Sequence, residues 1–184
     1  MNQPGPARAR SRRLPTVLLA LLLLVGSTAT APVAHADSWT IVPLSTWWHE
    51  GWEDNTLVPP SLSDYMRTLG YVRMRGEFGA ATAFQNNPAY PQRELTLMWH
   101  EGRQDDYITA TNDGRAAGFS AGYKYVMTLG YVFANPGYQG TVPLTQWWHP
   151  GRGDNLLAAT RATEDAARAA GYVFVRVEGY GWIY

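Results

Sequence analysis

Residues 142–155 read VPLTQWWHPGRGDN, and related runs occur at 42–55 (VPLSTWWHEGWEDN) and 93–106 (RELTLMWHEGRQDD). In every copy a leucine precedes the histidine by five residues, and the histidine precedes an aspartate by five. Successive histidines are 51 and 49 residues apart. A register shared this closely indicates an internal repeat, whose units bury their apolar faces against one another.

The third copy has the pattern of a β-β-α-β unit. Residues 144–148 are a short apolar run, the six residues after them are dense in turn formers, and 156–159 provide a return strand. Thr160 is placed to cap a helix over 161–170, with Gly171 at the position of a C-terminal cap. Residues 172–180 then form a third extended run.

The helices of the other two copies are less regular in sequence. In the first copy, Ser61 and Asp64 have the spacing of a capping box. In the second copy, Gly114 and Gly118 each weaken a helix by about 1 kcal/mol relative to alanine. We therefore expect a frayed turn in the second copy.

These patterns predict an α+β, β-rich fold for the whole chain after its leader. We expect three β-β-α-β repeats, at about 42–79, 93–131 and 142–180, closed about a pseudo-threefold axis in a trefoil-like ring. An open solenoid is the alternative, and it needs polar end caps that the sequence does not show.

The first 36 residues have the features of a secretory signal. Residues 8–13 are basic, 14–25 are apolar, and Ala34-His35-Ala36 forms a small-x-small cleavage site. We expect cleavage after Ala36, secretion, and a single domain at 37–184. An uncleaved membrane anchor is the alternative, although the apolar run has about a dozen residues where a span needs about 20. The arginine pair leaves either general or twin-arginine export open.

Composition excludes several classes of function. The chain has 15 basic and 15 acidic residues, but four arginines lie in the leader, which leaves 11 basic against 15 acidic residues with a single lysine. A chain of this charge has no electrostatic footprint for nucleic acid. Because it has no cysteine, disulfides, thiol catalysis and Cys-ligated zinc are excluded. Its stability must come from packing of its 24 aromatic residues and its aliphatic residues.

The copies resemble a repeat family of unassigned function found in secreted bacterial proteins, with units of about 40 residues reading Gly-Asp-x-x-x-Thr, then Gly-Tyr, then Glu-Gly. The matching residues in the third copy are Gly153-Asp154, Thr160, Gly171-Tyr172 and Glu178-Gly179. The family's histidine after the aspartate is replaced here by Asn55, Asp106 and Asn155. The resemblance implies an accessory module that recognises a polymer and does not catalyse a reaction.

Strand periodicity divides the aromatic residues between two faces. Leu144 and Trp148 share one face with their counterparts in the other copies, and we expect this face to be the core. Trp147 and His149 share the opposite face, which we expect to meet a ligand. The candidate ligand-binding residues are Trp47, His49, Asp54 and Asn55 in the first copy, Met98, His100, Arg103 and Asp105 in the second, and Trp147, His149, Arg152, Asp154 and Asn155 in the third.

The histidines and aspartates each allow a purely structural interpretation. Each histidine either hydrogen-bonds across its own hairpin, contacts a ligand, or joins the other two around a metal ion. Each aspartate either accepts hydrogen bonds from turn N–H groups or belongs to a polar cluster beside an exposed tryptophan, as in sugar sites. The histidines lie at strand exits, so we expect three separate sites and no metal or cofactor.

Catalytic motifs such as Gly-x-Ser-x-Gly and His-Glu-x-x-His are absent from the sequence. Three matching sites also favour binding, because catalysis needs unlike residues in unlike roles. We therefore expect a secreted, non-enzymatic module that recognises a polysaccharide or glycan, with no nucleic-acid partner and no membrane span. A protein-interaction or inhibitory module and a three-histidine metal protein are the alternatives.

Overall fold

The computed structural model describes residues 40–81 and 87–183, without the side chains of 75–77; the predicted leader and its cleavage site lie outside these residues. The first copy contains β1 (Ile41–His49), β2 (Asp54–Val58), the 3₁₀ helix η1 (Pro60–Leu62), α1 (Ser63–Thr68) and β3 (Val72–Ala81). The second contains β4 (Gln92–His100), β5 (Asp105–Thr109), α2 (Asn112–Ser120) and β6 (Lys124–Phe133). The third contains β7 (Thr141–His149), β8 (Asp154–Ala158), α3 (Arg161–Ala169) and β9 (Val173–Trp182).

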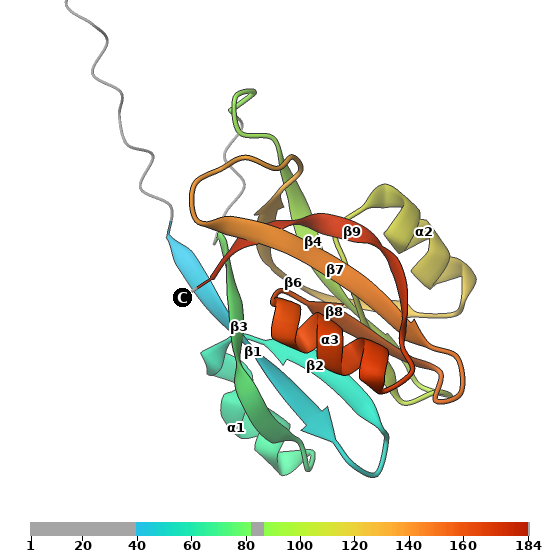
Figure 1. Ribbon diagram of the computed structural model, residues 1–184. Coiled ribbons are helices and arrows are strands. Elements are labelled where there is room, and N and C mark those ends of the chain that lie inside the picture. The colour runs from blue at the N-terminus through green and yellow to red at the C-terminus, as the bar shows by residue number, and fades with distance from the viewer. Residues whose placement is uncertain (1–39, 82–86, 184) are drawn as a thin grey trace, which may run out of the picture. The chain divides into compact units, whose positions relative to one another are not determined.

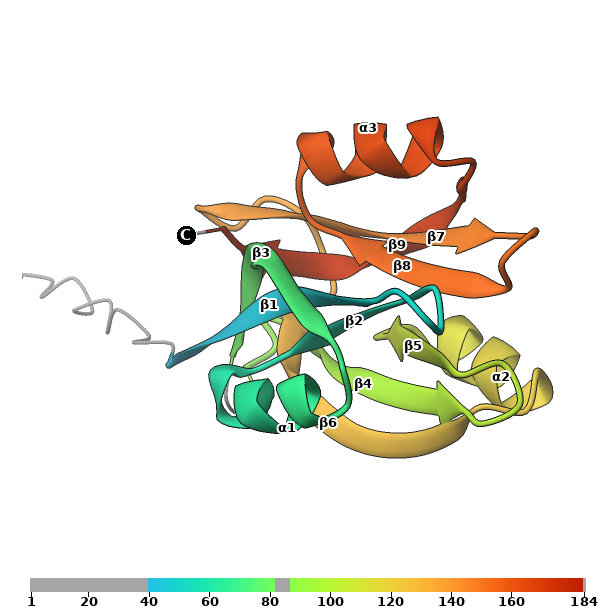
Figure 2. The ribbon, with the colours of Figure 1, turned by 90° about the horizontal axis from the view of Figure 1, so that it is seen from below.

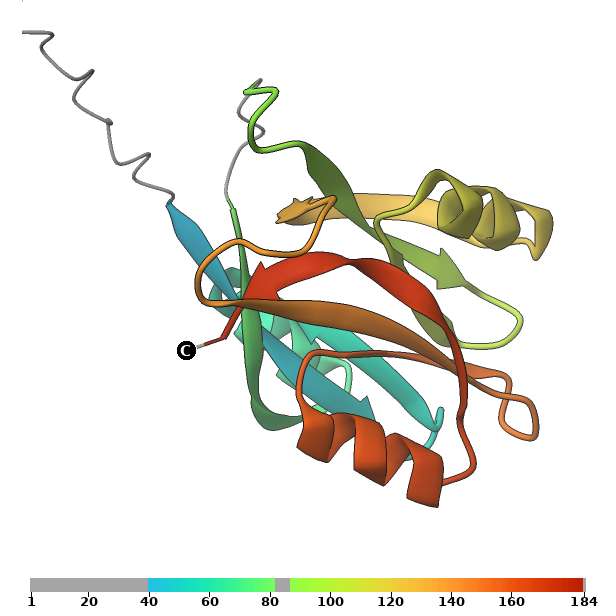
Figure 3. The same cartoon turned by 45° about the horizontal axis from the view of Figure 1, so that its top comes forward.

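Each copy forms a three-stranded antiparallel group around its long first strand. In the third copy, β7 pairs with β8 on one edge and with β9 on the other, so that β9 runs beside β7 (Figure 1, Figure 3). The three groups join through β3, β6 and β9. Each junction is a single bridging pair, and these pairs are Ala81–Tyr131, Gly79–Trp182 and Phe133–Tyr180.

The predicted fold class, α+β with three β-β-α-β repeats closed in a trefoil-like ring, is wrong. The strands described form one antiparallel sheet that stays open, with the path β2-β1-β3-β6-β9-β7-β8 and with β4 and β5 attached through β6. The physical reason lies at the hairpin edges. Strands β2, β5 and β8 contact one another, but no backbone ladder joins them among the described residues.

A shared core fills the space between the three groups. It contains the leucine of each long strand, Leu44, Leu95 and Leu144, together with Phe78 and Val132. Three smaller clusters surround Trp47, Met98 and Trp147, and those of the first and third copies include a residue of the copy's own helix. The helices lie apart from one another on the outside of the strands (Figure 2).

This arrangement corrects the predicted facing of the tryptophans. Trp47 and Trp147 are each 1% exposed and Met98 is fully buried, whereas the expected core residues Trp48, Trp99 and Trp148 are half-buried. The long strands are buried on both faces, by the shared core on one side and by the smaller clusters on the other. Neighbouring residues of each long strand do point to opposite faces, as predicted, but neither face is fully exposed.

The helix predictions have mixed outcomes. Thr160 caps α3 as predicted, since its hydroxyl accepts a hydrogen bond from the N–H of Thr163 at 3.1 Å. The expected capping box of the first copy is wrong, because Ser61 lies in η1 and α1 begins without a side-chain cap.

The frayed turn expected in the second copy is also wrong, since α2 is a nine-residue helix. Its glycines are buried against the sheet. A Cβ on Gly114 would lie 1.9 Å from the Thr109 hydroxyl, and one on Gly118 would lie 2.9 Å from the Tyr107 ring. The glycines therefore allow α2 to approach β5 closely, which offsets their low helix propensity.

A buried glutamate connects the third copy to the second. Glu178 on β9 is fully buried, and its Oε2 accepts four hydrogen bonds of 2.9 Å, from the backbone N–H groups of Ala110 and Thr111 and the hydroxyls of Thr109 and Thr111. Its Oε1 accepts a 2.7 Å hydrogen bond from Arg176 Nε. Strand β9 therefore organises the segment that leads into α2.

Candidate functional site

Three aspartates, one from each copy, meet at the contact between β2, β5 and β8. We call Asp54, Asp105 and Asp154 the aspartate cluster. All three are buried, and their carboxylate oxygens lie within 4.8 Å of one another. Each aspartate is the first residue of its hairpin return strand, so the sequence register that repeats these aspartates also brings them together.

Two kinds of donor surround each carboxylate of the aspartate cluster. One is the tyrosine hydroxyl of the same copy, with the pairs Tyr71–Asp54, Tyr123–Asp105 and Tyr172–Asp154. The other is a backbone N–H of a neighbouring copy, with Asp106 N to Asp54 Oδ1 at 2.9 Å, Asn155 N to Asp105 Oδ1 at 3.0 Å and Asn55 N to Asp154 Oδ1 at 3.4 Å. The aspartates thus accept hydrogen bonds from N–H groups on the outer edges of β2, β5 and β8, where no strand pairing is formed among the described residues.

The residue after each aspartate extends this network. Asn155 Nδ2 donates to Asp105 Oδ2 and to the Tyr123 hydroxyl, both at 2.9 Å. Asn55 makes the corresponding two contacts with the carboxylate and tyrosine of the third copy. In the second copy the same position is Asp106, which brings a fourth carboxylate into the cluster where the other copies supply an amide donor.

The electrostatics of the site follow from this crowding of acids. Burial, reinforced by repulsion from Asp106, raises the pKa of Asp54 to about 8. Burial raises the pKa of Asp106 to about 7, with repulsion from Asp105 and Asp154 adding to the effect. The pKa of Asp154 rises to about 8, chiefly through burial, and that of Asp105 rises for the same reason. Protons therefore remain on part of this group near neutral pH.

Within residues 40–81 and 87–183, the aspartate cluster is the one group whose acidic or imidazole donor atoms lie close enough to share an ion. Carboxylate oxygens suit hard cations such as Ca²⁺ or Mg²⁺. However, each carboxylate here already accepts a tyrosine O–H and a backbone N–H. The protein's own donors thus occupy this group, and the histidines do not belong to it.

The histidines hold the hairpin turns in place. His149 Nδ1 accepts the N–H of Arg152 and its Nε2 lies 3.0 Å from the carbonyl of Ala170, which follows α3. His49 makes the same two contacts with Trp52 N and the Leu69 carbonyl, and His100 Nδ1 accepts the N–H of Arg103. A carbonyl can only accept, so Nε2 of His49 and of His149 carries the hydrogen. These contacts are of the kind that the hairpin alternative describes, and the ligand-contacting role of His49 and His149 stays a prediction.

We expect His149→Ala to lower the free energy of unfolding by about 1–3 kcal/mol, because it leaves two backbone groups without their partner. Urea denaturation of the variant and of the unchanged chain measures this difference. An unchanged free energy of unfolding would show that the two contacts of His149 do not stabilise the turn.

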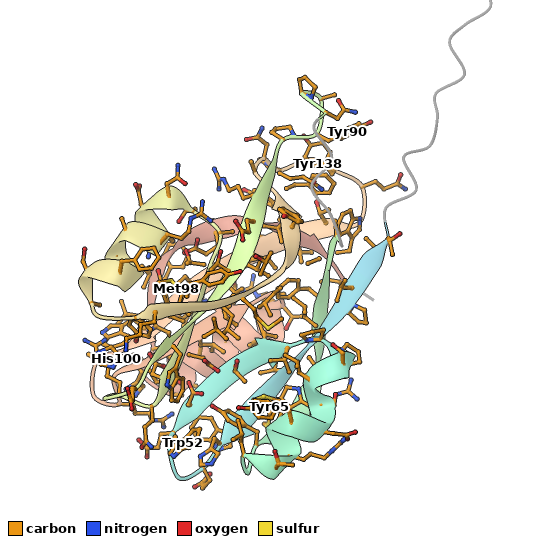
Figure 4. All side chains as sticks on the ribbon, turned by 180° about the vertical axis from the view of Figure 1, so that it is seen from behind. Trp52, Tyr65, Tyr90, Met98, His100 and Tyr138 are labelled. Carbon is orange, nitrogen blue, oxygen red and sulfur yellow. The ribbon has the colours of Figure 1, made fainter. Side chains whose placement is uncertain are left out.

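Trp47, Met98 and Trp147 cannot serve as the expected ligand platform, because their side chains are buried. Figure 4 shows Met98 among the strands and His100 near a hairpin end. The half-buried tryptophans Trp48, Trp99 and Trp148 instead line three clefts, each formed by two neighbouring copies. We name each cleft after its tryptophan.

The clefts have corresponding linings. The Trp48 cleft, of about 500 Å³, is lined by Thr46, Trp48, Asn55 and Met74 and, across from them, by Arg152, Leu156, Tyr172 and α3 residues. The Trp148 cleft, of about 290 Å³, is lined by Gln146, Trp148, Asn155, Val175 and Arg176 and by Arg103, Tyr107, Tyr123 and α2 residues. The Trp99 cleft, of about 480 Å³, is lined by Leu97, Trp99, Asp106, Val126 and Met127 and by Trp52, Val58, Tyr71 and α1 residues.

Arginine accompanies the aromatic rings in two of the clefts. The Arg103 guanidinium lies 5.6 Å from the Trp148 ring centroid and 5.7 Å from that of Tyr123. The Arg152 guanidinium lies 6.0 Å from the Tyr172 ring centroid. Of the predicted site residues, Asn55, Arg103, Arg152 and Asn155 line clefts. Asp106 was not predicted as a site residue, although the sequence has asparagine at this position in the other two copies.

Comparison with known proteins gives no relative: no family model, no curated protein and no solved structure matches the chain. Within the part of the chain that the structure describes, none of the helices has the length and apolar character needed to cross a membrane.

Proposed function

We propose that the protein is an exported, non-enzymatic module that binds carbohydrate, of a cell wall or an extracellular polysaccharide, through the Trp48 and Trp148 clefts. The observation that carries this proposal is the combination of a half-buried tryptophan, an arginine and an asparagine in each cleft. An aromatic ring receives the apolar face of a sugar, and a few polar groups bind its hydroxyls. Volumes of about 290 and 500 Å³ suit one or two sugar units.

The chemistry of the two clefts supports binding in preference to catalysis. Neither lining contains an aspartate, glutamate or histidine, whereas glycoside hydrolysis commonly needs two carboxyl groups and acyl transfer needs an activated nucleophile. Two similar clefts on one chain also increase the apparent affinity for a polymer, because the second contact is intramolecular.

Polysaccharide pull-down followed by titration calorimetry on residues 37–184 tests this function. We expect Trp48→Ala or Trp148→Ala to weaken binding about tenfold and the double variant to weaken it more than about a hundredfold, since avidity is lost as well. Phe119→Ala is the matched control, because this exposed aromatic residue on α2 does not line either cleft. Unchanged binding by the double variant, or no binding by the unchanged chain, would refute the proposal.

One observation favours a second candidate, a protein-interaction module. Val173, Phe174, Val175 and Val177 of β9 are exposed, and in this stretch β9 pairs with β7 along one edge only, within the described residues. Binding of a secreted protein that survives the Trp48/Trp148 double variant and is lost in Phe174→Ser would support this candidate.

A further inference from the structure

We propose that the Trp99 cleft is a site for an organic cation, such as a quaternary ammonium group. This inference is independent of carbohydrate binding, because it concerns a different cleft and a different ligand chemistry. It depends on two positions at which one copy differs from the other two. One position lies in the first copy and the other in the second, and both residues line this cleft.

The first change replaces a cation with an aromatic ring. Position 52 is tryptophan, whereas the corresponding positions 103 and 152 are arginine. In the Trp148 cleft the guanidinium of Arg103 lies over the tryptophan and tyrosine rings. In the Trp99 cleft no arginine, lysine or histidine is among the lining residues. The position that an arginine occupies in the other two clefts is therefore occupied by an aromatic ring in the Trp99 cleft.

The second change replaces a neutral amide with an acid. Asp106 stands where Asn55 and Asn155 stand in the other copies, and it lines the Trp99 cleft. It is 8% exposed, and the charged groups that act on it are Asp105 of its own strand and Asp154 of β8, with Asp54 of β2 also beside it. A cation in the cleft would lie beside Asp106 and offset part of the negative charge of this group.

Several aromatic rings of the cleft lie close enough together for one small cation to contact more than one of them. The Trp52 ring centroid lies 5.6 Å from that of Trp99 and 5.8 Å from that of Tyr71. Tyr65 of α1 is 60% exposed, and Figure 4 shows it and Trp52 on the same side of the molecule. Aromatic ring faces attract cations within about 6 Å, and such groupings recognise quaternary ammonium ligands.

The remaining lining selects the class of cation. Val58, Leu62, Met66 and Leu69 make the cleft largely apolar, so a strongly hydrated metal ion, which needs several oxygen ligands, does not match it. A cation covered by methyl groups buries its apolar surface while it retains its charge. The volume of about 480 Å³ accommodates a trimethylammonium group with a short chain.

Titration with choline, and with its neutral carbon isostere 3,3-dimethylbutan-1-ol, tests the proposal through intrinsic tryptophan fluorescence and calorimetry. We expect choline to bind at least about tenfold more tightly than the isostere. Trp52→Arg, which supplies the residue of the other copies, should abolish choline binding, and Asp106→Asn should weaken it about tenfold or more. Equal affinity for choline and the isostere, or no detectable choline binding, would overturn the proposal.

Two further variants make the result independent of folding defects. Tyr65→Ala changes an exposed side chain and should weaken choline binding several-fold with an unchanged unfolding midpoint. The double variant Arg152→Trp/Asn55→Asp places both changes in the Trp48 cleft, whose lining contains no other arginine, lysine or histidine, and should raise the stoichiometry of choline binding from one to two. Full binding by Tyr65→Ala together with an unchanged stoichiometry of the double variant would contradict the assignment, whatever the outcome with polysaccharides.

Discussion

Replacement of Trp147 by alanine is expected to lower the free energy of unfolding by about 3–5 kcal/mol, as truncation of a large buried aromatic residue does. The Trp147 side chain is 1% exposed, packs in a cluster with Leu156 and Ala167, and donates from Nε1 to the Thr145 hydroxyl at 2.9 Å. The substitution leaves a cavity between the sheet and α3. Urea denaturation followed by far-UV circular dichroism measures the loss.

Trp148→Ala is the matched control, because the two residues are neighbours of the same type on one strand. The Trp148 side chain is half-buried, so its truncation should cost less than about 2 kcal/mol. Equal unfolding midpoints for the two variants would contradict the facing found here, as would a larger loss for Trp148→Ala.

Asp106→Asn is expected to stabilise the protein by about 2–4 kcal/mol at pH 9, with little effect at pH 4. Asp106 has a pKa of about 7 in the folded chain against about 4 in an unfolded one. A carboxyl group with a raised pKa contributes stability that is present below pH 4 and is lost as pH rises through 7, because the folded state binds more protons. An asparagine removes this loss, and it supplies an amide that can donate to Asp54 and Tyr71.

Chemical denaturation at several pH values between 4 and 9 measures this effect. The unchanged chain should lose stability steadily across the range, with Asp54, Asp105 and Asp154 contributing to the slope, and the variant should show a smaller slope. Asp113→Asn, which changes an exposed aspartate of α2, serves as a control and should leave the pH profile unchanged. Parallel profiles for Asp106→Asn and the unchanged chain would show that Asp106 is not protonated in the fold.

The sequence predicts local elements well where local rules decide them. The strand at 144–148, the cap at Thr160 and the left-handed Gly171, with φ of 95°, are all present. It predicts α2 poorly. Helix propensity alone treats Gly114 and Gly118 as destabilising, but these glycines allow a close approach to β5, which is a tertiary contact that local rules do not include. The prediction of a closed ring is wrong for a related reason. The repeat shows which positions of the three copies correspond, but the hydrogen bonds between copies decide whether the sheet closes.

The candidate site was predicted only in part. Alternation along the strand correctly separated Trp147 from Trp148, but it could not show that Ala167 of α3 packs beside Trp147. The aspartates were recognisable by register, yet their meeting depends on strands from three separate copies. The clefts could not be predicted from one copy, because each lining combines residues of two copies.

The contacts of Glu178 on β9 have a consequence for the order of folding. While the chain is synthesised from its N-terminus, the donors at 109–111 are made almost seventy residues before the carboxylate that accepts from them. The second copy therefore cannot complete its packing until the last strand has emerged, and contacts at such long separation slow folding.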